Sequence, residues 1–157
     1  MSKIIGSLLA MSLLCAVTFA QLATRKALTL NAAKQIAAAA EAEALKNQWN
    51  VVIAVADDGG NLLYLQRMDG TQVGSVQVAI DKARSAVLFR RPTKVFEDAV
   101  LGGRNGVMKL EGAMPVEGGL PLVIDGAIVG SIGVSGVTSQ QDGIIAKAGA
   151  EAAARMK

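Results

Sequence analysis

The 157-residue chain contains no histidine, and its single cysteine, Cys15, lies in the apolar N-terminal segment. Without imidazole the chain cannot form a Ser-His-Asp or Cys-His nucleophile system, a zinc site of cysteine and histidine, or a histidine-ligated heme. A chain that loses its N-terminal segment also has no thiol and therefore no disulfide. Any chemistry must use carboxylates, lysine, arginine, hydroxyls, methionine, tyrosine and backbone amides.

A large excess of positive charge is also missing. The formal net charge is +3, and residues 1–20 contribute only Lys3 to it, which leaves about +2 for the rest of the chain. Arg67 and the Arg90-Arg91 pair are isolated and do not belong to a basic stripe. These features predict that nucleic acid is not a partner.

The first twenty residues are typical of a secretory signal. Lys3 gives a short positive start, an apolar run follows, and Thr18-Phe19-Ala20 resembles the small-x-small cleavage pattern. We interpret residues 1–20 as a signal peptide and residues 21–157 as a single domain, long enough for one core. An uncleaved anchor is the alternative, although the run is short for a membrane span. The expected location is periplasmic or secreted, with no membrane attachment after cleavage.

The remaining sequence alternates helical and extended patterns. Apolar residues at helical spacing predict helices that begin near residue 30, at residue 74 and after Thr93, the last of these ending near residue 101. Thr29 or Asn31 is the expected N-cap of the first helix, and Ser139-Gln140-Gln141-Asp142 resembles the capping signal of a terminal helix.

Two pairs of apolar runs predict two β-hairpins. Residues 51–56 and 62–68 are joined by a glycine-bearing turn, and residues 120–125 and 127–135 are joined by Asp125-Gly126. Residues 106–111 form a further candidate strand. The order of elements predicts an α+β domain, in which helices pack on an antiparallel sheet.

Glycine recurs within the second hairpin, at positions 130, 133 and 136, where side chains normally stand. This pattern indicates that something approaches the backbone closely, either a ligand or a neighbouring subunit. A dinucleotide loop is disfavoured, because these glycines lie within a strand and not between the strand and helix of a βαβ unit.

Five segments in order, and a sixth short one, resemble the GlcG/HbpS-like family. They are 55–62 (VADDGGNL), 66–70 (QRMDG), 79–83 (AIDKA), 117–121 (EGGLP) and 130–136 (GSIGVSG), followed by 141–142 (QD). The resemblance implies a profilin-like antiparallel sheet, a homo-oligomer and, for some members, heme binding in an exported or sensory setting. Other members of the family are associated with the utilisation of small acids or diols.

Several residues in and around these segments are candidates for a site. The candidate ligand-binding residues are Arg67, Asp69, Lys82, Met114, Glu117, Gly118, Gly119 and Asp142. Lys82 and Glu117 are also candidate catalytic residues, should the protein be an enzyme. We expect positions 67, 82 and 117 to meet beside the second hairpin and to leave a hollow there.

Each candidate also has a plain structural interpretation. Arg67 and Asp69 share a face of an extended strand and would clamp an acidic ligand or pair with each other. Lys82 would hold a carboxylate, act as a base or extend its stem to solvent. Glu117 and the two glycines after it would line a pocket or only form a turn. Asp142 would complement a helix dipole.

Heme is the cofactor that the resemblance implies, and no residues are candidates for any other metal. Its iron would have a weak ligand such as Met114, Lys109 or a hydroxyl, and Arg67 or Arg104 would pair with its propionates. Three functions follow. The first is an exported protein that binds heme or another tetrapyrrole as its small-molecule ligand. The second is a cofactor-independent enzyme for a small organic acid or carbonyl compound, with proton transfer by Lys82 and Glu117. The third is a structural homo-oligomer without a ligand.

Overall fold

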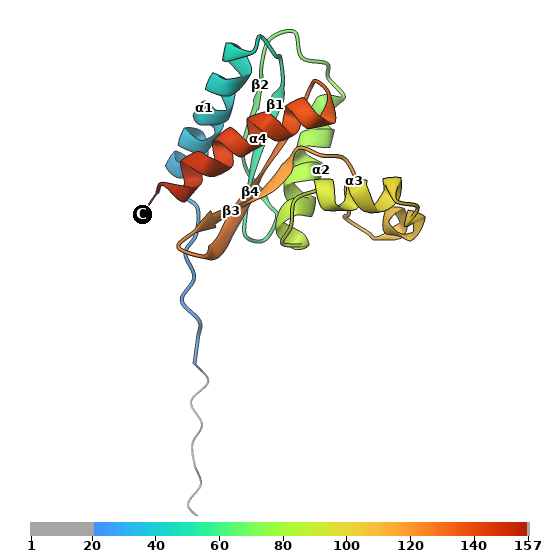
Figure 1. The fold of residues 1–157 in the computed structure, drawn as a ribbon. Helices are drawn as coiled ribbons and strands as arrows, with labels where there is room; N and C mark the ends of the chain where they lie inside the picture. The colour runs from blue at the N-terminus through green and yellow to red at the C-terminus, as the bar shows by residue number, and fades with distance from the viewer. Residues whose placement is uncertain (1–20, 157) are drawn as a thin grey trace, which may run out of the picture.

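The computed structural model describes residues 21–156. The signal peptide that we predict over residues 1–20 lies outside this range. Among the described residues, the fold is α+β, with helices packed on one four-stranded antiparallel sheet (Figure 1). The fold class predicted from the sequence is therefore confirmed. No helix in residues 21–156 has the length and apolar character needed to cross a membrane.

The sheet joins the two predicted hairpins. Strands β1 (Val52–Asp57) and β2 (Leu62–Arg67) form the first hairpin, and β3 (Gly119–Ile124) and β4 (Ala127–Ser135) form the second. Antiparallel pairing of β1 with β4 gives the strand order β2-β1-β4-β3. Asp125 and Gly126 have φ values of 50° and 76°, as a two-residue hairpin turn of type I′ requires.

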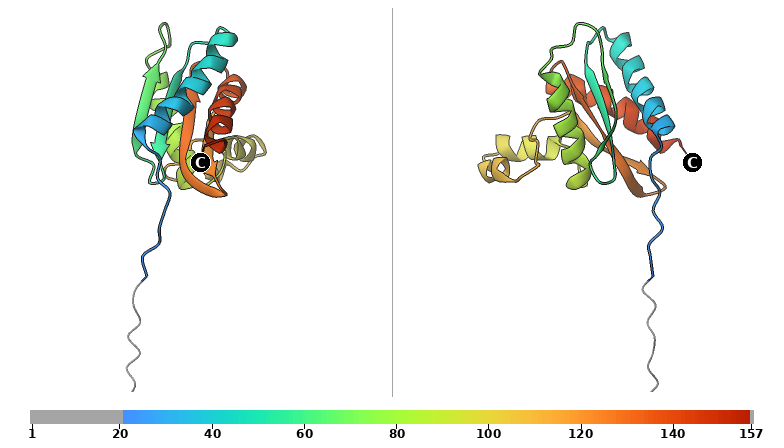
Figure 2. Two further views of the ribbon diagram at one scale, coloured as in Figure 1. Left: turned by 90° about the vertical axis from the view of Figure 1, so that its left-hand side faces the viewer. Right: turned by 180° about the vertical axis from the view of Figure 1, so that it is seen from behind.

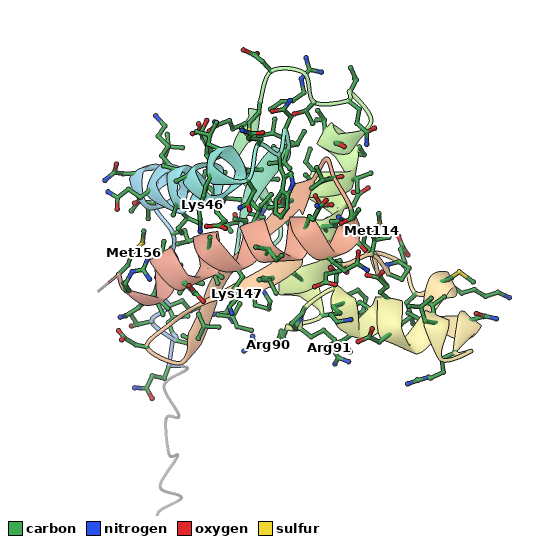
Figure 3. All side chains as sticks on the ribbon, turned by 45° about the horizontal axis from the view of Figure 1, so that its top comes forward. Lys46, Arg90, Arg91, Met114, Lys147 and Met156 are labelled. Carbon is green, nitrogen blue, oxygen red and sulfur yellow. The ribbon has the colours of Figure 1, made fainter. Side chains whose placement is uncertain are left out.

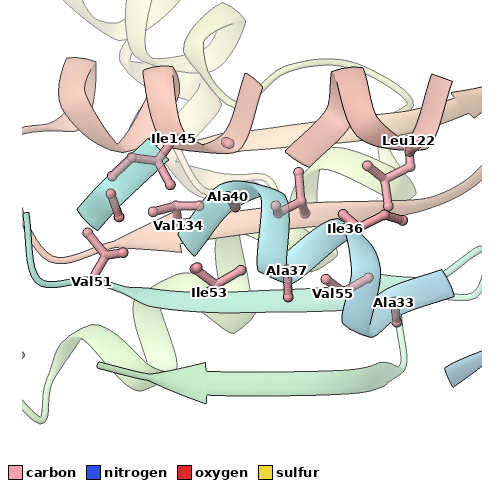
Figure 4. Packing of buried hydrophobic residues seen from close by; sticks show 14 of the residues in the cluster. Ala33, Ile36, Ala37, Ala40, Val51, Ile53, Val55, Leu122, Val134 and Ile145 are labelled. Carbon is pink, nitrogen blue, oxygen red and sulfur yellow. The ribbon is translucent and has the colours of Figure 1, made fainter. Parts of the chain in front are cut away.

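Helices cover both faces of the sheet. Helices α1 (Leu30–Lys46) and α4 (Ser139–Ala154) lie on one face, and α2 (Ser75–Leu88) lies on the other (Figures 1 and 2). The larger core lies under α1 and α4, where alanines of α1 approach branched side chains of β1 and β4 (Figure 4). A smaller cluster lies under α2, around Val52, Ala54 and Ala56.

A short helical arm projects from the body. It consists of α3 (Lys94–Leu101) and a 3₁₀ helix, η1 (Asn105–Lys109), and Figure 1 and the right view of Figure 2 show it standing to one side of the sheet. The prediction of a strand over residues 106–111 was wrong. This segment lies away from the sheet, where a strand finds no partner, and it closes a tight turn instead, because Leu110 N–H donates to Val107 O.

Threonines begin two of the helices with side-chain caps. Thr29 Oγ1 accepts from Ala32 N–H, which confirms one of the two N-caps predicted for α1. Helix α4 begins one residue earlier than its predicted signal, because Thr138 is the N-cap and Gln141 completes a capping box. This register places Asp142 one position further into the helix, with its side chain turned inward.

Candidate functional site

The glycines of the second hairpin allow helix α2 to pack very close to β3 and β4. A Cβ atom on Gly133 would lie 2.1 Å from Ala79 O, and one on Gly119 would lie 2.4 Å from Lys82 O. Both oxygens belong to the backbone of α2. Close approach was predicted from Gly130, Gly133 and Gly136. It is made within the same chain, by α2 at Gly133, by Ala56 O of β1 at Gly130 and by Asn50 O at Gly136, and protein atoms fill the space where a hollow was expected.

Lys82 lies inside this contact and not on the surface. It shares the buried face of α2 with Ala79 and Ala83, and its side chain is only 1% exposed. The Nζ atom donates to Val134 O at 2.9 Å and to Asp142 Oδ2 at 2.8 Å. Lys82 therefore forms a buried ion pair between α2 and α4, and it does not extend its stem to solvent.

Asp142 is held from several sides in the first part of α4. Its Oδ1 atom accepts from Val137 N–H at 3.2 Å, and the residue is 2% exposed. Burial raises the pKa of this carboxyl, and the hydrogen bond and charge of Lys82 offset only part of the effect. Asp142 therefore ties the start of α4 to α2, which its predicted role as a helix-dipole residue does not require.

The loop that carries Glu117, Gly118 and Gly119 covers this ion pair. Gly118 has a φ of 125°, and a Cβ atom at this position would lie 2.8 Å from Lys82 Nζ. The Glu117 carboxylate lies over Gly143 of α4, and its side chain is 21% exposed. The loop thus needs glycine both for its backbone conformation and for its contact with the lysine.

Thr93, predicted only as the start of a helix, and Glu97, which was not predicted as a site residue, hold this loop in place. Thr93 Oγ1 accepts from Gly119 N–H at 2.9 Å, and Thr93 N–H donates to Gly119 O. Glu97 Oε2 accepts from Glu117 N–H, and Glu97 Oε1 accepts from Ser139 Oγ at 3.1 Å. In the sequence, Thr93 is fully explained as the start of a helix. Only the tertiary structure therefore identifies the contacts that Thr93 and Glu97 make with this loop.

Arg67 and Asp69 do not join this cluster. Arg67 ends β2, at one edge of the sheet, and Glu117 precedes β3, at the other edge. Three strand spacings separate these edges, which corresponds to about 14 Å. Both Arg67 and Asp69 are exposed. Of the predicted site residues, the structure thus brings together Lys82, Glu117, Gly118, Gly119 and Asp142.

Met114 lines a separate groove of about 560 Å³ between α2 and the segment that returns from the arm. Figure 3 labels Met114 on this return segment, and its backbone N–H donates to Ser85 Oγ at 3.0 Å. The other lining residues are Asp81, Arg84, Leu88, Glu111, Gly112 and Ala113. Arg84 has no ion pair among the residues that the structure describes. It had not been identified as a candidate.

Two further residues predicted for heme binding lie on the arm. Arg104 precedes η1, Lys109 ends it, and both are exposed. Neither residue lines the groove beside Met114. Within residues 21–156, no group of three or more acidic side chains is placed to hold a metal ion.

These features define a class of small α+β proteins in which a helix packs closely on a glycine-rich hairpin and a loop covers a buried Lys-Asp pair. A profile of the family described as "Haem degrading protein HbpS-like" matches residues 28–151, and the chain belongs to this family. The resemblance inferred from the six sequence segments is therefore confirmed.

Individual relatives agree with this assignment. Protein GlcG of Escherichia coli K12 is 46% identical over 112 residues, which cover 71% of this chain and 84% of GlcG. The crystal structure of a double mutant of HbpS from Streptomyces reticuli superposes with a TM-score of 0.76 at 34% identity and covers 87% of this chain and 93% of that chain. A structure described as a PduOC:heme complex gives 0.72 at 29% identity and covers 81% and 95%.

Proposed function

We propose that this protein binds heme or a closely related tetrapyrrole in the groove beside Met114. The observation that carries the proposal is the family, because a relative with the same fold is described as a heme complex. The groove supports it further, since its volume lies within the range of small-molecule sites. The buried Lys82 cluster offers no comparable space, because protein atoms surround the lysine.

Three of the residues that line the groove could hold a weakly ligated heme, and the Asp81 and Glu111 carboxylates beside them restrict the propionates to the Arg84 side. Met114 supplies a thioether, which serves as an axial ligand in some heme proteins. Arg84 supplies a guanidinium that suits a propionate, and Leu88 supplies apolar surface. When bound, the iron porphyrin would supply the redox and ligand chemistry, and these three side chains would hold and orient it. A chain without histidine leaves thioether, amine or hydroxyl ligands for the iron.

The proposal includes export of the protein. A periplasmic or secreted location follows from the signal-like pattern of residues 1–20. A binder in such a compartment would meet heme outside the cytoplasm. Release of heme there is helped by a weak, exchangeable ligand, and a neutral methionine thioether would be such a ligand for the iron.

A heme titration followed in the Soret region tests the proposal. We expect saturable binding at one site per chain, or one per pair of chains, and about tenfold weaker binding after Arg84→Gln, because a charge-assisted hydrogen bond is lost. Met114→Ala is expected to change the position of the Soret band. Met108→Ala is the matched control, because Met108 is 59% exposed and does not line the groove.

A featureless spectrum at micromolar heme would refute heme binding. Saturable binding that neither Arg84→Gln nor Met114→Ala alters would refute the groove as the heme site.

Proton transfer by Lys82 and Glu117 is the second function predicted for this protein, and it has less structural support. A substrate would have to displace the Gly118 backbone to reach Lys82 Nζ.

A further inference from the structure

Two adjoining hollows lie beside the segment that precedes α1. The charged hollow has a volume of about 400 Å³, and its charged side chains are those of Arg25, Lys26, Asp58, Arg90 and Asp125. The apolar hollow has a volume of about 310 Å³, and its large apolar side chains are those of Leu28, Ile124, Val129 and Met156. Lys26 and Ile124 line both hollows, so the two adjoin. Neither hollow shares a residue with the groove at Met114.

Residues 24–29 form one wall of both hollows, and a glycine of the sheet allows this wall to lie close. A Cβ atom on Gly130 would lie 2.6 Å from Leu28 Cδ1, so any side chain at this position would displace the leucine. Leu28 also packs against the larger core. Figure 1 shows the segment, in blue, beside the turn that joins β3 and β4. The segment before α1 therefore belongs to the folded domain and encloses the hollows.

The charged hollow has one positive charge in excess. The Arg25 guanidinium lies 3.6 Å from the Asp58 carboxylate. Lys26 pairs in the same way with Asp125, so both acidic side chains of the hollow already have a partner. Arg90 forms no ion pair with any residue in the range 21–156. An unpaired guanidinium complements a single carboxylate, which it binds with two parallel hydrogen bonds.

The backbone of Arg90 indicates that its side chain has a role in this hollow. Arg90 N–H donates to Val87 O at the end of α2. Arg91 N–H donates to Ala86 O, which completes a Schellman motif. Arg90 takes the left-handed position of this motif with a φ of 52°, although glycine is the usual residue there. A long side chain held in an unfavourable backbone conformation points to a function for that side chain.

The apolar hollow suits a hydrocarbon group. Ile124 of β3 and Val129 of β4 form its floor at the sheet, and Met156, which follows α4, lines it as well. Figure 3 labels Met156 and Arg90, which line the apolar and the charged hollow respectively. The unbranched methionine side chain adapts to groups of different shape. An alkyl chain placed here would leave water, which favours binding in proportion to the area that it buries.

We propose that the two hollows together bind a medium-chain carboxylic acid. Its carboxylate pairs with Arg90 in the charged hollow, and its tail passes Lys26 and Ile124 into the apolar hollow. Lys26 suits the junction, because its stem is apolar while its ammonium group is held by Asp125. The site is separate from the groove proposed for heme, so neither proposal depends on the other.

Calorimetric titration of the purified protein with octanoate tests this site without any variant. We expect saturable binding of one equivalent per chain. Octanol lacks the carboxylate that pairs with Arg90, and butyrate lacks most of the tail, so each should bind at least about tenfold more weakly than octanoate.

Variants of each hollow locate the ligand. Arg90→Gln should weaken octanoate binding about tenfold and leave octanol binding unchanged, because only the carboxylate contact is lost. Arg90→Gly should weaken octanoate binding equally while raising the urea concentration at half unfolding, since glycine accommodates the positive φ. Arg104→Gln is the matched control for charge, because Arg104 is exposed on the arm and lines neither hollow. Ala32→Phe should also weaken octanoate binding by filling the apolar hollow, whereas Ala38→Phe, at an exposed position of the same helix, should not.

Several outcomes would overturn the proposal. They are the absence of saturable octanoate binding, octanol binding as tight as that of octanoate, and octanoate binding that Arg90→Gln and Ala32→Phe leave unchanged. Arg84→Gln should leave octanoate binding unaltered, and Arg90→Gln should leave the heme titration unaltered, so the two sites fail separately. Heme binding that is weakened by Arg90→Gln and not by Arg84→Gln would assign these hollows to heme and overturn both proposals.

Discussion

The Lys82–Asp142 ion pair places two charges in the protein interior, 2.8 Å apart. Removal of two charges from water is costly, and here the cost is offset by their mutual attraction and by hydrogen bonds from the backbone. Lys82 also donates to Val134 O, and Asp142 accepts from Val137 N–H. The pair therefore contributes little net stability, and its main effect is to fix the positions of α2, β4 and α4 relative to one another.

We predict that Lys82→Met lowers the free energy of unfolding by about 3–5 kcal/mol, because it leaves the buried Asp142 carboxylate without its cationic partner. Urea unfolding measures this change. The double variant Lys82→Met/Asp142→Leu should recover part of the loss, since both charges are then absent. The control is Lys147→Met, which removes an exposed pair with Glu151 and should cost about 0.5 kcal/mol or less. Equal losses in Lys82→Met and Lys147→Met would contradict the prediction.

At the scale of elements, the sequence predicted those helices and hairpins whose residue patterns are local. Turn chemistry at Asp125-Gly126 was sufficient for the second hairpin, because the type I′ turn needs residues that tolerate positive φ. Residues 106–111 could not be assigned in this way. Their short apolar pattern suits a strand. In the structure, however, they belong to the arm and lie too far from the sheet to pair with it, and the sequence alone does not indicate this distance.

Contacts between distant segments were also outside the reach of local patterns. Lys82 and Asp142 are 60 residues apart in the chain, and the periodicity of α2 indicates only that Lys82 adjoins an apolar face. Gly133, together with Gly130 and Gly136, indicated that something approaches the backbone closely. They could not identify α2 as that element, because a ligand, a subunit and a helix make the same demand for missing side chains.

The packing of α2 on β4 gives a prediction at this scale. Gly133→Ala should lower the free energy of unfolding by about 3 kcal/mol, because the new Cβ atom would lie 2.1 Å from Ala79 O and 2.5 Å from Ala83 N, and backbone atoms of a helix cannot move singly. Chemical denaturation of the two proteins measures the difference. Gly106→Ala is the control, since no atom lies within 4 Å of its added Cβ. A Gly133→Ala protein as stable as the control would show that α2 does not pack as described.

At the scale of the whole molecule, residues 21–156 combine a closely packed centre with surfaces at its periphery. The glycine-mediated contact and the buried ion pair occupy the junction of α2, β4 and α4. The groove at Met114 lies outside this junction. The local patterns in the sequence determine the junction and leave the groove unassigned, which explains why the sequence indicates the fold more sharply than the site.

The export proposed above concerns the whole chain. We predict that the full-length chain, produced in a Gram-negative host, is recovered from the periplasm or medium with Gln21 as its first residue, because Thr18-Phe19-Ala20 presents small residues at the positions that signal peptidase recognises. Intact-mass measurement of fractionated cells identifies this end. Ala20→Phe should block cleavage, whereas Gln21→Asn, beyond the recognised positions, should not. Recovery of the uncleaved chain from the cytoplasm would refute export and, with it, the proposal that the protein meets heme outside the cytoplasm. The heme titration would still test binding in the groove.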